Sequence, residues 1–350
     1  MLNLPPFRPR FPWWGADLQT VRDVLRPERH NTGASSPMEV VVGGDDRLLA
    51  YLDQPLQGQP LGLVLLVHGL GGNGERGGVR RLGATLQATG FSVLRLNLRG
   101  AGAGRILARG SYAAQCNRDI LPVIQVARQL CKTVGPPNPP LPLMGVGLSL
   151  GGSILLNACL KPEGGGPSLD RLACVSSPLD LNASADQLER QRNAIYQHYI
   201  LRGLCHQILA DPAGVSDRER QALIGATRVR TIRAFDAAIT APRWGFNSVS
   251  HYYAEASPLG KIRSGYSLPP TLLLQARDDP WVPPEAAASL LQSPLPDLTV
   301  VLTDQGGHNG FHSRKRDDRE MRGPTDSIGN GCWSDHLVAR WLVDRSCEDQ

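Results

Sequence analysis

Several absences limit what this 350-residue chain can be. Lysine is scarce, and the positive charge is almost entirely arginine, with lysine only at Lys132, Lys161, Lys261 and Lys315. The net charge of +5 is dispersed along the chain, and aromatic residues make up only 5% of it. Since nucleic-acid binding needs a basic surface concentrated on one face, and no basic stripe alternates with aromatics here, we expect no nucleic-acid partner.

Paired cysteines and long apolar runs are missing as well. The seven cysteines include no C-x-x-C pair, so zinc-binding and thioredoxin-like classes lack support, and an odd number suits a reducing compartment. The first residues have no apolar segment like that of a signal peptide. The longest apolar runs, such as 63–67, are too short to span a bilayer. We therefore expect a cytoplasmic protein without a transmembrane segment.

The order of apolar and helical segments predicts an α/β fold. After a Pro- and Arg-rich arm at 1–37, residues 38–53 have the pattern of a β-hairpin. From there, short apolar runs alternate with segments of helical spacing, which is typical of a mostly parallel sheet with helices on both faces. The runs expected to form its further strands are 62–67, 91–96, 143–147, 172–175, 271–275 and 298–302.

Residues 180–268 interrupt this alternation. Their pattern is helical and polar, with aromatic residues in clusters. We interpret them as a helical cap inserted over the sheet of an α/β core, which would then comprise 38–179 and 269–350. The charged, Gly-rich stretch 312–332 is expected to be a surface loop.

The clearest chemical signal is a candidate nucleophile. Gly147-Leu148-Ser149-Leu150-Gly151 matches G-x-S-x-G and stands between an apolar run and a helical segment, the context that this motif requires. Glycines flank the serine because the strand-to-helix turn is too tight for side chains there. The turn would expose the Ser149 hydroxyl at a helix N-terminus, where developing negative charge is favoured. A chance match among 38 glycines is the alternative, and the strand–helix context argues against it.

Acyl transfer also needs two N–H donors for the tetrahedral oxyanion. We expect them from the backbone of Leu150, directly after the nucleophile, and of Leu70, in the Gly-rich loop after the first long apolar run. His68 directly precedes that loop. The order of triad residues places the catalytic histidine last in the chain, which argues against His68 as the base. We therefore keep His68 as a candidate pocket residue. The loop contains neither G-x-G-x-x-G nor G-K-[ST], so it does not predict a nucleotide site.

The acid and the base should follow the nucleophile in that order. Asp278 and Asp279 both come directly after the run 271–275, and we favour Asp279 because a D-P-x-V-P run after a strand commonly carries the acid as its first residue. His308, flanked by glycines after the next apolar run, is the predicted base, with His312 as its rival.

Beyond the triad, the chain resembles the YheT-like family of α/β-hydrolases, also called abhydrolase family 4. The resemblance runs from about Trp13 to Trp341, cap included. Its motifs are Ser177-Pro178-Leu179-Asp180-Leu181, Ile195–Leu201, Phe235–Pro242, Trp244-Gly245-Phe246, Tyr252-Tyr253, Ala276–Pro280 and Gly306–Phe311. By resemblance, the triad is Ser149, Asp279 and His308. Two family blocks differ: Y-H-S-G reads Tyr112-Ala113-Ala114-Gln115 here, and H-L-Q-T reads Asp17-Leu18-Gln19-Thr20. We expect both differences to affect the pocket rim.

Together these residues predict a serine hydrolase that cleaves carboxylic acyl esters through an acyl-enzyme, with no metal or cofactor. The resemblance implies carboxylesterases that act on acyl esters and glycerolipids, so the expected partner is a small-molecule ester or lipid, with Phe246 of the cap as a further pocket candidate. Two alternatives stay open: acyl transfer on the same triad, and a catalytically silent α/β-hydrolase that serves as a binding module. The oligomeric state is not predicted.

Overall fold

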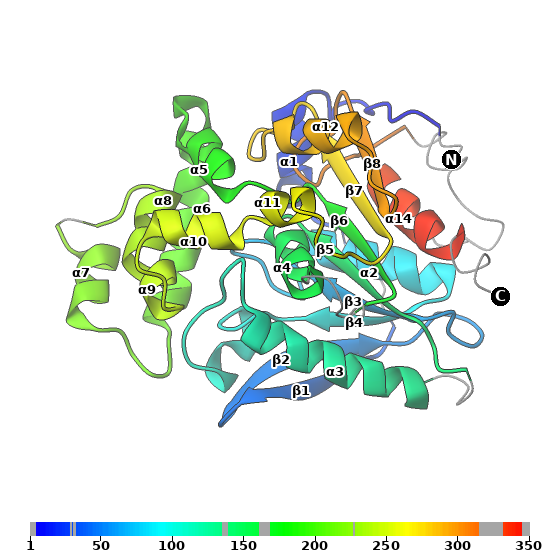
Figure 1. The fold of residues 1–350 in the computed structure, drawn as a ribbon, viewed down its shortest axis with the longest axis horizontal. Coiled ribbons are helices and arrows are strands. Elements are labelled where there is room, and N and C mark those ends of the chain that lie inside the picture. The colour runs from blue at the N-terminus through cyan, green and yellow to red at the C-terminus, as the bar shows by residue number, and fades with distance from the viewer. Residues whose placement is uncertain are drawn as a thin grey trace.

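The computed structural model describes residues 5–28, 30, 33–134, 139–160, 169–226, 228–314 and 332–344. Within these ranges, eight strands form one sheet in the order β1-β2-β4-β3-β5-β6-β7-β8 (Figure 1). The strands are β1 (Ser35–Gly43), β2 (Asp46–Asp53), β3 (Leu63–Val67), β4 (Ser92–Leu96), β5 (Leu143–Leu148), β6 (Arg171–Val175), β7 (Thr271–Ala276) and β8 (Leu298–Thr303). The hairpin β1–β2 is antiparallel to its neighbours, and β3 to β8 run parallel.

Helices cover both faces of this sheet. The core helices are α2 (Gly77–Thr89), α3 (Asn117–Thr133), α4 (Leu150–Cys159), α12 (Glu285–Gln292) and α14 (Trp333–Asp344), with a short 3₁₀ turn η1 (Gly102–Leu107). One apolar cluster joins α3, α4 and α12 to one face of the sheet, and a second joins α2 and α14 to the other. The predicted α/β-hydrolase fold, with a mostly parallel sheet and helices on both faces, is confirmed.

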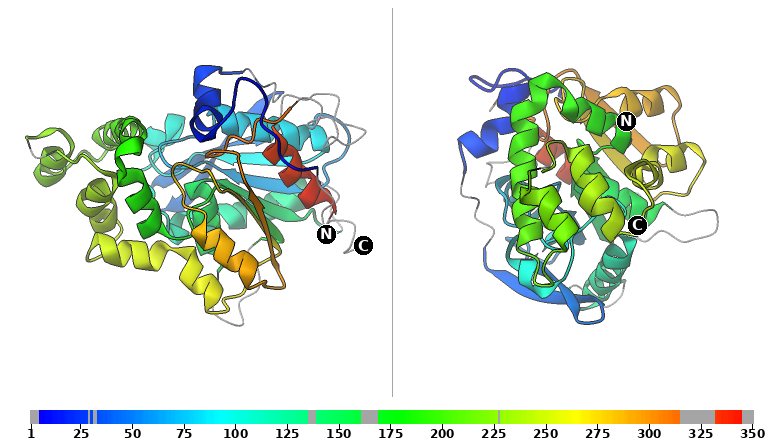
Figure 2. Two further views of the ribbon diagram at one scale, coloured as in Figure 1. Left: turned by 90° about the horizontal axis from the view of Figure 1, so that it is seen from above. Right: turned by 90° about the vertical axis from the view of Figure 1, so that its left-hand side faces the viewer.

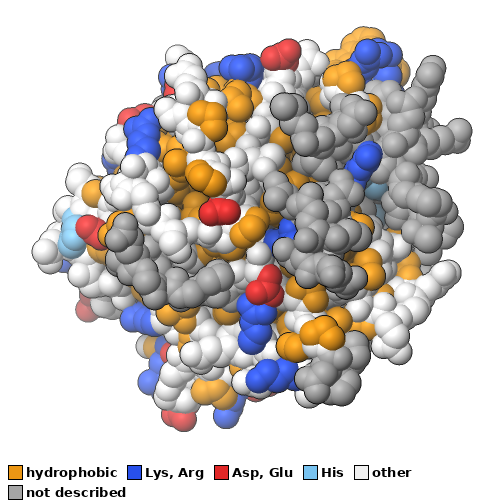
Figure 3. All heavy atoms as spheres, turned by 45° about the vertical axis from the view of Figure 1, so that its right-hand side comes forward, with side chains coloured by type: hydrophobic (Ala, Val, Ile, Leu, Met, Phe, Trp, Pro, Cys, Tyr) orange, Lys and Arg blue, Asp and Glu red, His pale blue; other side chains and the backbone are white. Residues whose placement is uncertain are grey.

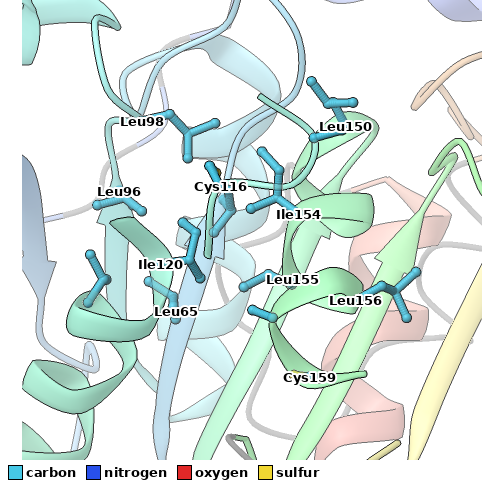
Figure 4. Packing of buried hydrophobic residues seen from close by; sticks show 14 of the residues in the cluster. Leu65, Leu96, Leu98, Cys116, Ile120, Leu150, Ile154, Leu155, Leu156 and Cys159 are labelled. Carbon is cyan, nitrogen blue, oxygen red and sulfur yellow. The ribbon is translucent and has the colours of Figure 1, made fainter. Parts of the chain in front are cut away.

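The apolar character of the strands is explained by the helices that cover both faces of the sheet. All five residues of β3 are buried, and successive side chains enter opposite clusters, Leu65 one and Leu66 the other. Figure 4 shows Leu65 and Leu96 of the sheet near Ile120 of α3 and Ile154 of α4. A strand buried on both faces is apolar at most of its positions, which is why these strands appear in the sequence as nearly continuous apolar runs.

The segment between β6 and β7 is helical, and most of it lies to one side of the sheet, at the left in Figure 1, while its last helix returns to the core. It contains α5 (Leu181–Glu189), η2 (Gln191–Asn193), α6 (Ala194–Leu209), α7 (Asp217–Ile224), α8 (Ile232–Phe235), η3 (Asp236–Thr240), α9 (Ala241–Arg243), α10 (Val249–Ala256) and α11 (Pro258–Arg263). We keep the name cap for residues 180–268. Leu201, Leu204 and Ile208 of α6 pack in a separate small apolar cluster, so the cap has a core of its own.

The N-terminal segment is more structured than an arm. It forms the helix α1 (Ala16–Leu25), and β1 already begins at Ser35, inside the predicted arm 1–37. Figure 2 shows α1 beside the upper part of the cap and against the core. Most of the predicted loop 312–332, namely 315–331, lies outside the described residues.

The described surface mixes charges of both signs. On the face drawn in Figure 3, acidic, basic and apolar side chains appear in small separate groups. Of the helices that the structure describes, none is long and apolar enough to cross a membrane.

Candidate active site

Ser149 occupies a strained turn between β5 and α4. Its φ of 53° is in the left-handed region, which is rare for a residue with a side chain. The turn needs glycines on both sides: a Cβ on Gly147 would lie 2.2 Å from the backbone nitrogen of Gly152, and one on Gly151 would lie 2.3 Å from the carbonyl oxygen of Val67. This geometry places the Ser149 side chain at the N-terminus of α4, where a negative charge is stabilised.

Three predicted residues meet at this turn. His308 Nε2 lies 2.9 Å from Ser149 Oγ, and His308 Nδ1 lies 2.9 Å from Asp279 Oδ2 and 3.2 Å from Oδ1. His308 and Asp279 are both buried. The three side chains therefore form a continuous hydrogen-bonded relay, although more than 120 positions separate Ser149 from the other two in sequence.

The two adjacent aspartates point to different partners. Asp279 Oδ1 accepts hydrogen bonds from the N–H groups of Trp281 and Val282, at 2.8 and 3.0 Å, and Oδ2 accepts one from Gln275 Nε2 at 3.1 Å. Asp278 Oδ1 instead accepts from the N–H of Gly307 at 2.9 Å, and burial raises the pKa of this carboxyl. Asp279 thus contacts the imidazole ring, while Asp278 supports the loop that carries it.

The helix α1 forms the back of the histidine loop. The His308 N–H donates to Thr20 Oγ1 at 2.9 Å. Gly307 has a φ of 59°, and a Cβ there would lie 2.5 Å from the carbonyl oxygen of Ala16. On the other side, the Trp281 ring lies against the imidazole with the centroids 4.3 Å apart. Sequence reasoning missed Thr20 as a neighbour of His308, because no local pattern relates the two segments.

His312, the rival base, is placed elsewhere. Its N–H donates to Gln19 Oε1 at 2.7 Å, and its ring nitrogen Nε2 lies 3.4 Å from Asp23 Oδ1. Burial, together with the guanidinium of Arg81, holds the pKa of His312 well below its usual range, so the ring is neutral. It packs against α1 and does not contact Ser149.

The residues expected to supply the oxyanion donors come from the two segments that border Ser149: Leu150 follows it directly, and a Cβ on Gly69, the residue before Leu70, would lie 2.8 Å from Ser149 Cβ. Leu70 and Leu150 line the same cavity as the serine. Within the described part of the chain, neither of their N–H groups donates to a protein acceptor. Tyr112 Oη accepts from the N–H of the next residue, Gly71, at 2.7 Å and so supports this loop. Two donors at this position would suit a tetrahedral oxyanion.

His68 differs from the prediction that it is a pocket residue. Its ring is buried beneath the loop: Nε2 accepts from the N–H of Leu98 at 3.1 Å, so Nδ1 carries the proton and donates to the carbonyl oxygen of Gly69 at 2.8 Å. Burial lowers the pKa of His68 to about 4, which keeps it neutral. Both ring nitrogens are occupied by backbone partners, so His68 supports the loop and does not line the cavity.

An apolar cavity opens beside Ser149 and His308. Its empty volume is about 890 Å³, including the opening to solvent. The cap supplies much of the wall through Leu181, Ala185, Leu188, Ile200, Leu204, Ile208, Ile232 and Phe235. Phe246, the other predicted pocket residue, is not part of this wall, because its ring packs on Tyr252 with the centroids 5.1 Å apart.

One carboxyl group interrupts the apolar wall. Asp236 begins the π-helical turn η3 and accepts a hydrogen bond from Tyr253 Oη at 2.8 Å. Burial raises the pKa of Asp236 to about 6. Sequence reasoning noted this residue only within a family block. The described residues contain no group of three His, Cys, Asp or Glu side chains placed to hold a metal ion.

The parallel sheet of this order, with a serine on the turn after β5 and a histidine loop after β8, defines the α/β-hydrolase class. The chain belongs to the family described as serine aminopeptidase, S33, whose model matches residues 58–314.

Individual relatives agree with this class. The YheT protein of Escherichia coli strain K12 is 29% identical over 269 residues, 77% of this chain and 76% of that protein, and the expected YheT-like resemblance is confirmed. The medium-chain fatty acid ethyl ester synthase/esterase 2 of Saccharomyces cerevisiae is 29% identical, and phospholipase ABHD3 of Mus musculus is 27% identical. The matches cover 72% and 71% of this chain, and 58% of the length of either relative.

A solved structure shares the fold. The monoglyceride lipase of Saccharomyces cerevisiae, a soluble variant bound to a substrate analogue, superposes with a TM-score of 0.57. The match covers 91% of this chain and 98% of that one, at 15% sequence identity.

Proposed function

We propose that this protein is a carboxylic ester hydrolase that forms an acyl-enzyme on Ser149. The observation that carries the proposal is the relay from Asp279 through His308 to Ser149, which ends at the wall of an apolar cavity. The names of the relatives, an ester synthase/esterase and a phospholipase, support an ester substrate.

Each residue has one role in the proposed reaction. His308 Nε2 takes the proton from Ser149 Oγ as the oxygen attacks the ester carbonyl, and Asp279 stabilises the imidazolium that forms. The N–H groups of Leu70 and Leu150 bind the oxyanion. His308 then returns the proton to the leaving alcohol. A water molecule, deprotonated by the same nitrogen, attacks the acyl-enzyme. His308 returns this proton to Ser149 Oγ as the bond to the acyl group breaks and the carboxylic acid leaves.

The cavity suggests which half of the ester it holds. Most of its cap wall consists of aliphatic and aromatic side chains, which would bury an apolar acyl chain, and the Asp236 carboxyl in this wall is already paired with Tyr253. We therefore propose a fatty acyl ester, with the acyl chain under the cap.

The test is the reaction of the whole protein with a fluorophosphonate probe and with p-nitrophenyl octanoate. Wild type should label and hydrolyse, and Ser149→Ala should do neither, since loss of a triad nucleophile costs about 10⁶ in kcat. A folded wild-type protein that fails to label would instead be the silent binding module. Cleavage of amino-acid p-nitroanilides in preference to esters would indicate an aminopeptidase and overturn the ester proposal.

A second candidate is acyl transfer to an alcohol on the same acyl-enzyme. The name of the yeast relative, an ethyl ester synthase as well as an esterase, favours it. Adding ethanol to the octanoate reaction distinguishes the two. A transferase would convert most of the acyl groups into ethyl octanoate, and a hydrolase would release mainly octanoic acid.

A further inference from the structure

The helix α1 buries its polar side and exposes its apolar side. At 100° per residue, Ala16, Gln19, Thr20, Arg22 and Asp23 occupy one half of the helix, and Asp17, Leu18, Val21, Val24 and Leu25 the other. Gln19 and Arg22 are only 1% and 2% exposed, whereas Leu18 and Leu25 are 41% and 63% exposed. An ordinary surface helix has the reverse arrangement.

Specific contacts hold the helix in this orientation. Gln19 Nε2 donates to the carbonyl oxygens of Trp13 and His312, and Thr20 accepts from the N–H of His308. Arg22 pairs with Asp23 and Glu28. A rotation that buried the leucines would break the hydrogen bonds of Gln19 and Thr20 to the histidine loop. The outward apolar face is therefore a consequence of how α1 supports the histidine loop.

Two further exposed apolar side chains come directly before the helix in the chain. Phe11 and Trp14 precede α1, are 75% and 57% exposed, and contact each other with their ring centroids 5.4 Å apart. Arg8 and Arg26 are also exposed, on either side of these apolar groups in the sequence, and form no ion pair among the described residues. Apolar and aromatic side chains with unpaired arginines suit the boundary between the acyl chains and anionic headgroups of a bilayer.

We propose that the docking face, defined as Phe11, Trp14, Leu18, Val24 and Leu25, binds the surface of a lipid bilayer. The proposal rests on the proposed function, because fatty acyl esters are poorly soluble in water and partition into lipid bilayers, from which the hydrolase would take them. The position of the face suits this role, since Thr20, on the opposite side of the same helix, contacts the backbone of His308. Docking through α1 would bring the active site close to the lipid surface.

The test compares the double variant Leu18→Glu/Leu25→Glu with wild type and with a control double variant, Val41→Glu/Ile224→Glu. The control side chains are 56% and 58% exposed, on β1 and α7, and the charge change is the same. Co-sedimentation is measured with vesicles of equal parts phosphatidylcholine and phosphatidylglycerol. We expect wild type and control to bind, and the α1 variant to bind roughly ten- to a hundredfold more weakly, because two leucines no longer enter the bilayer.

Two further measurements complete the test. All three proteins should hydrolyse p-nitrophenyl butyrate, a water-soluble ester, at the same rate, so a failure of docking is distinguishable from a failure of catalysis. Equal vesicle binding by the α1 variant and wild type would overturn the proposal, as would absence of binding by wild type. A wild-type dimer in solution that the α1 variant converts to monomers would also overturn it, since the occupant of the face would then be a second copy.

Discussion

The divided roles of Asp278 and Asp279 make a sharp prediction at the scale of single residues. Asp279→Asn should lower kcat by about 10⁴, because an amide favours the wrong imidazole tautomer. Asp278→Asn should keep activity within about tenfold of wild type and lower the free energy of unfolding by about 1 kcal/mol. Steady-state kinetics on p-nitrophenyl octanoate check both. An inactive Asp278→Asn with an active Asp279→Asn would reverse the assignment.

The two neighbouring histidines provide a similar pair. His308→Ala should behave like Ser149→Ala, since the members of a triad act as a unit. His312→Ala removes a neutral, buried ring that lies against α1. We expect it to lower the melting temperature while kcat stays within about tenfold of wild type. Thermal unfolding and kinetics on the same samples separate the two effects, and the opposite result would make His312 the base.

At the scale of elements, α1 should position the histidine loop. Thr20→Val removes the acceptor of the His308 N–H, and we expect kcat to fall by about tenfold, the value of one neutral hydrogen bond, with KM unchanged. Thr20→Ser should restore the rate.

Thr89→Val is the matched control for Thr20→Val. Thr89 Oγ1 also donates to the carbonyl four residues earlier in a helix, but it is the last residue of α2 and does not line the cavity. A kcat loss of the same size in both variants, with equal loss of melting temperature, would show that Thr20 is merely structural.

The cap should set the preference for acyl chain length. Ala185 of α5 lines the cavity, so Ala185→Leu would fill part of it and shift the optimum toward shorter p-nitrophenyl esters. Phe246→Ala serves as the control, because Phe246 packs on Tyr252 outside the cavity wall. It should lower stability and leave the chain-length profile intact. A profile that responds to Phe246 and not to Ala185 would locate the acyl chain elsewhere.

At the scale of the whole molecule, Asp236 should make stability depend on pH. Its pKa rises from 3.8 to about 6 on burial, so the folded state binds the proton more tightly than the unfolded state. This contribution is complete below pH 3.8 and is lost as the pH rises through 6. Asp236→Asn has no such loss. Its stability relative to wild type should therefore increase between about pH 4 and pH 7, by up to about 3 kcal/mol.

Urea unfolding of both proteins across this pH range measures the difference. If the gap between Asp236→Asn and wild type stays constant with pH, the carboxyl keeps its ordinary pKa in the fold. A gap that narrows as the pH rises would mean that the pKa is lowered.

The sequence alone determined the fold class and the position of Ser149. Strands buried on both faces are mostly apolar, so β3 to β7 are visible as nearly continuous apolar runs. The nucleophile turn is equally local, since its glycines avoid clashes with residues of the same turn or the adjacent strand. Steric limits in a turn and burial on both faces of a strand both constrain residues that are close together in sequence. Their effects are therefore visible in the sequence without coordinates.

Only the tertiary structure decided which side chains meet. Whether Asp278 or Asp279 contacts the imidazole depends on the direction of each side chain, and the role of His312 depends on α1, nearly 300 residues earlier. His68 and Phe246 were predicted to line the pocket, yet their packing partners hold them outside it. The orientation of α1 is a further case. Its leucines alone would predict that the apolar side of the helix is buried, whereas in the structure the polar side is buried. Contacts between distant segments set these outcomes. Sequence motifs favoured Asp279 and His308, but they contained no information on the packing of His68, Phe246 and α1.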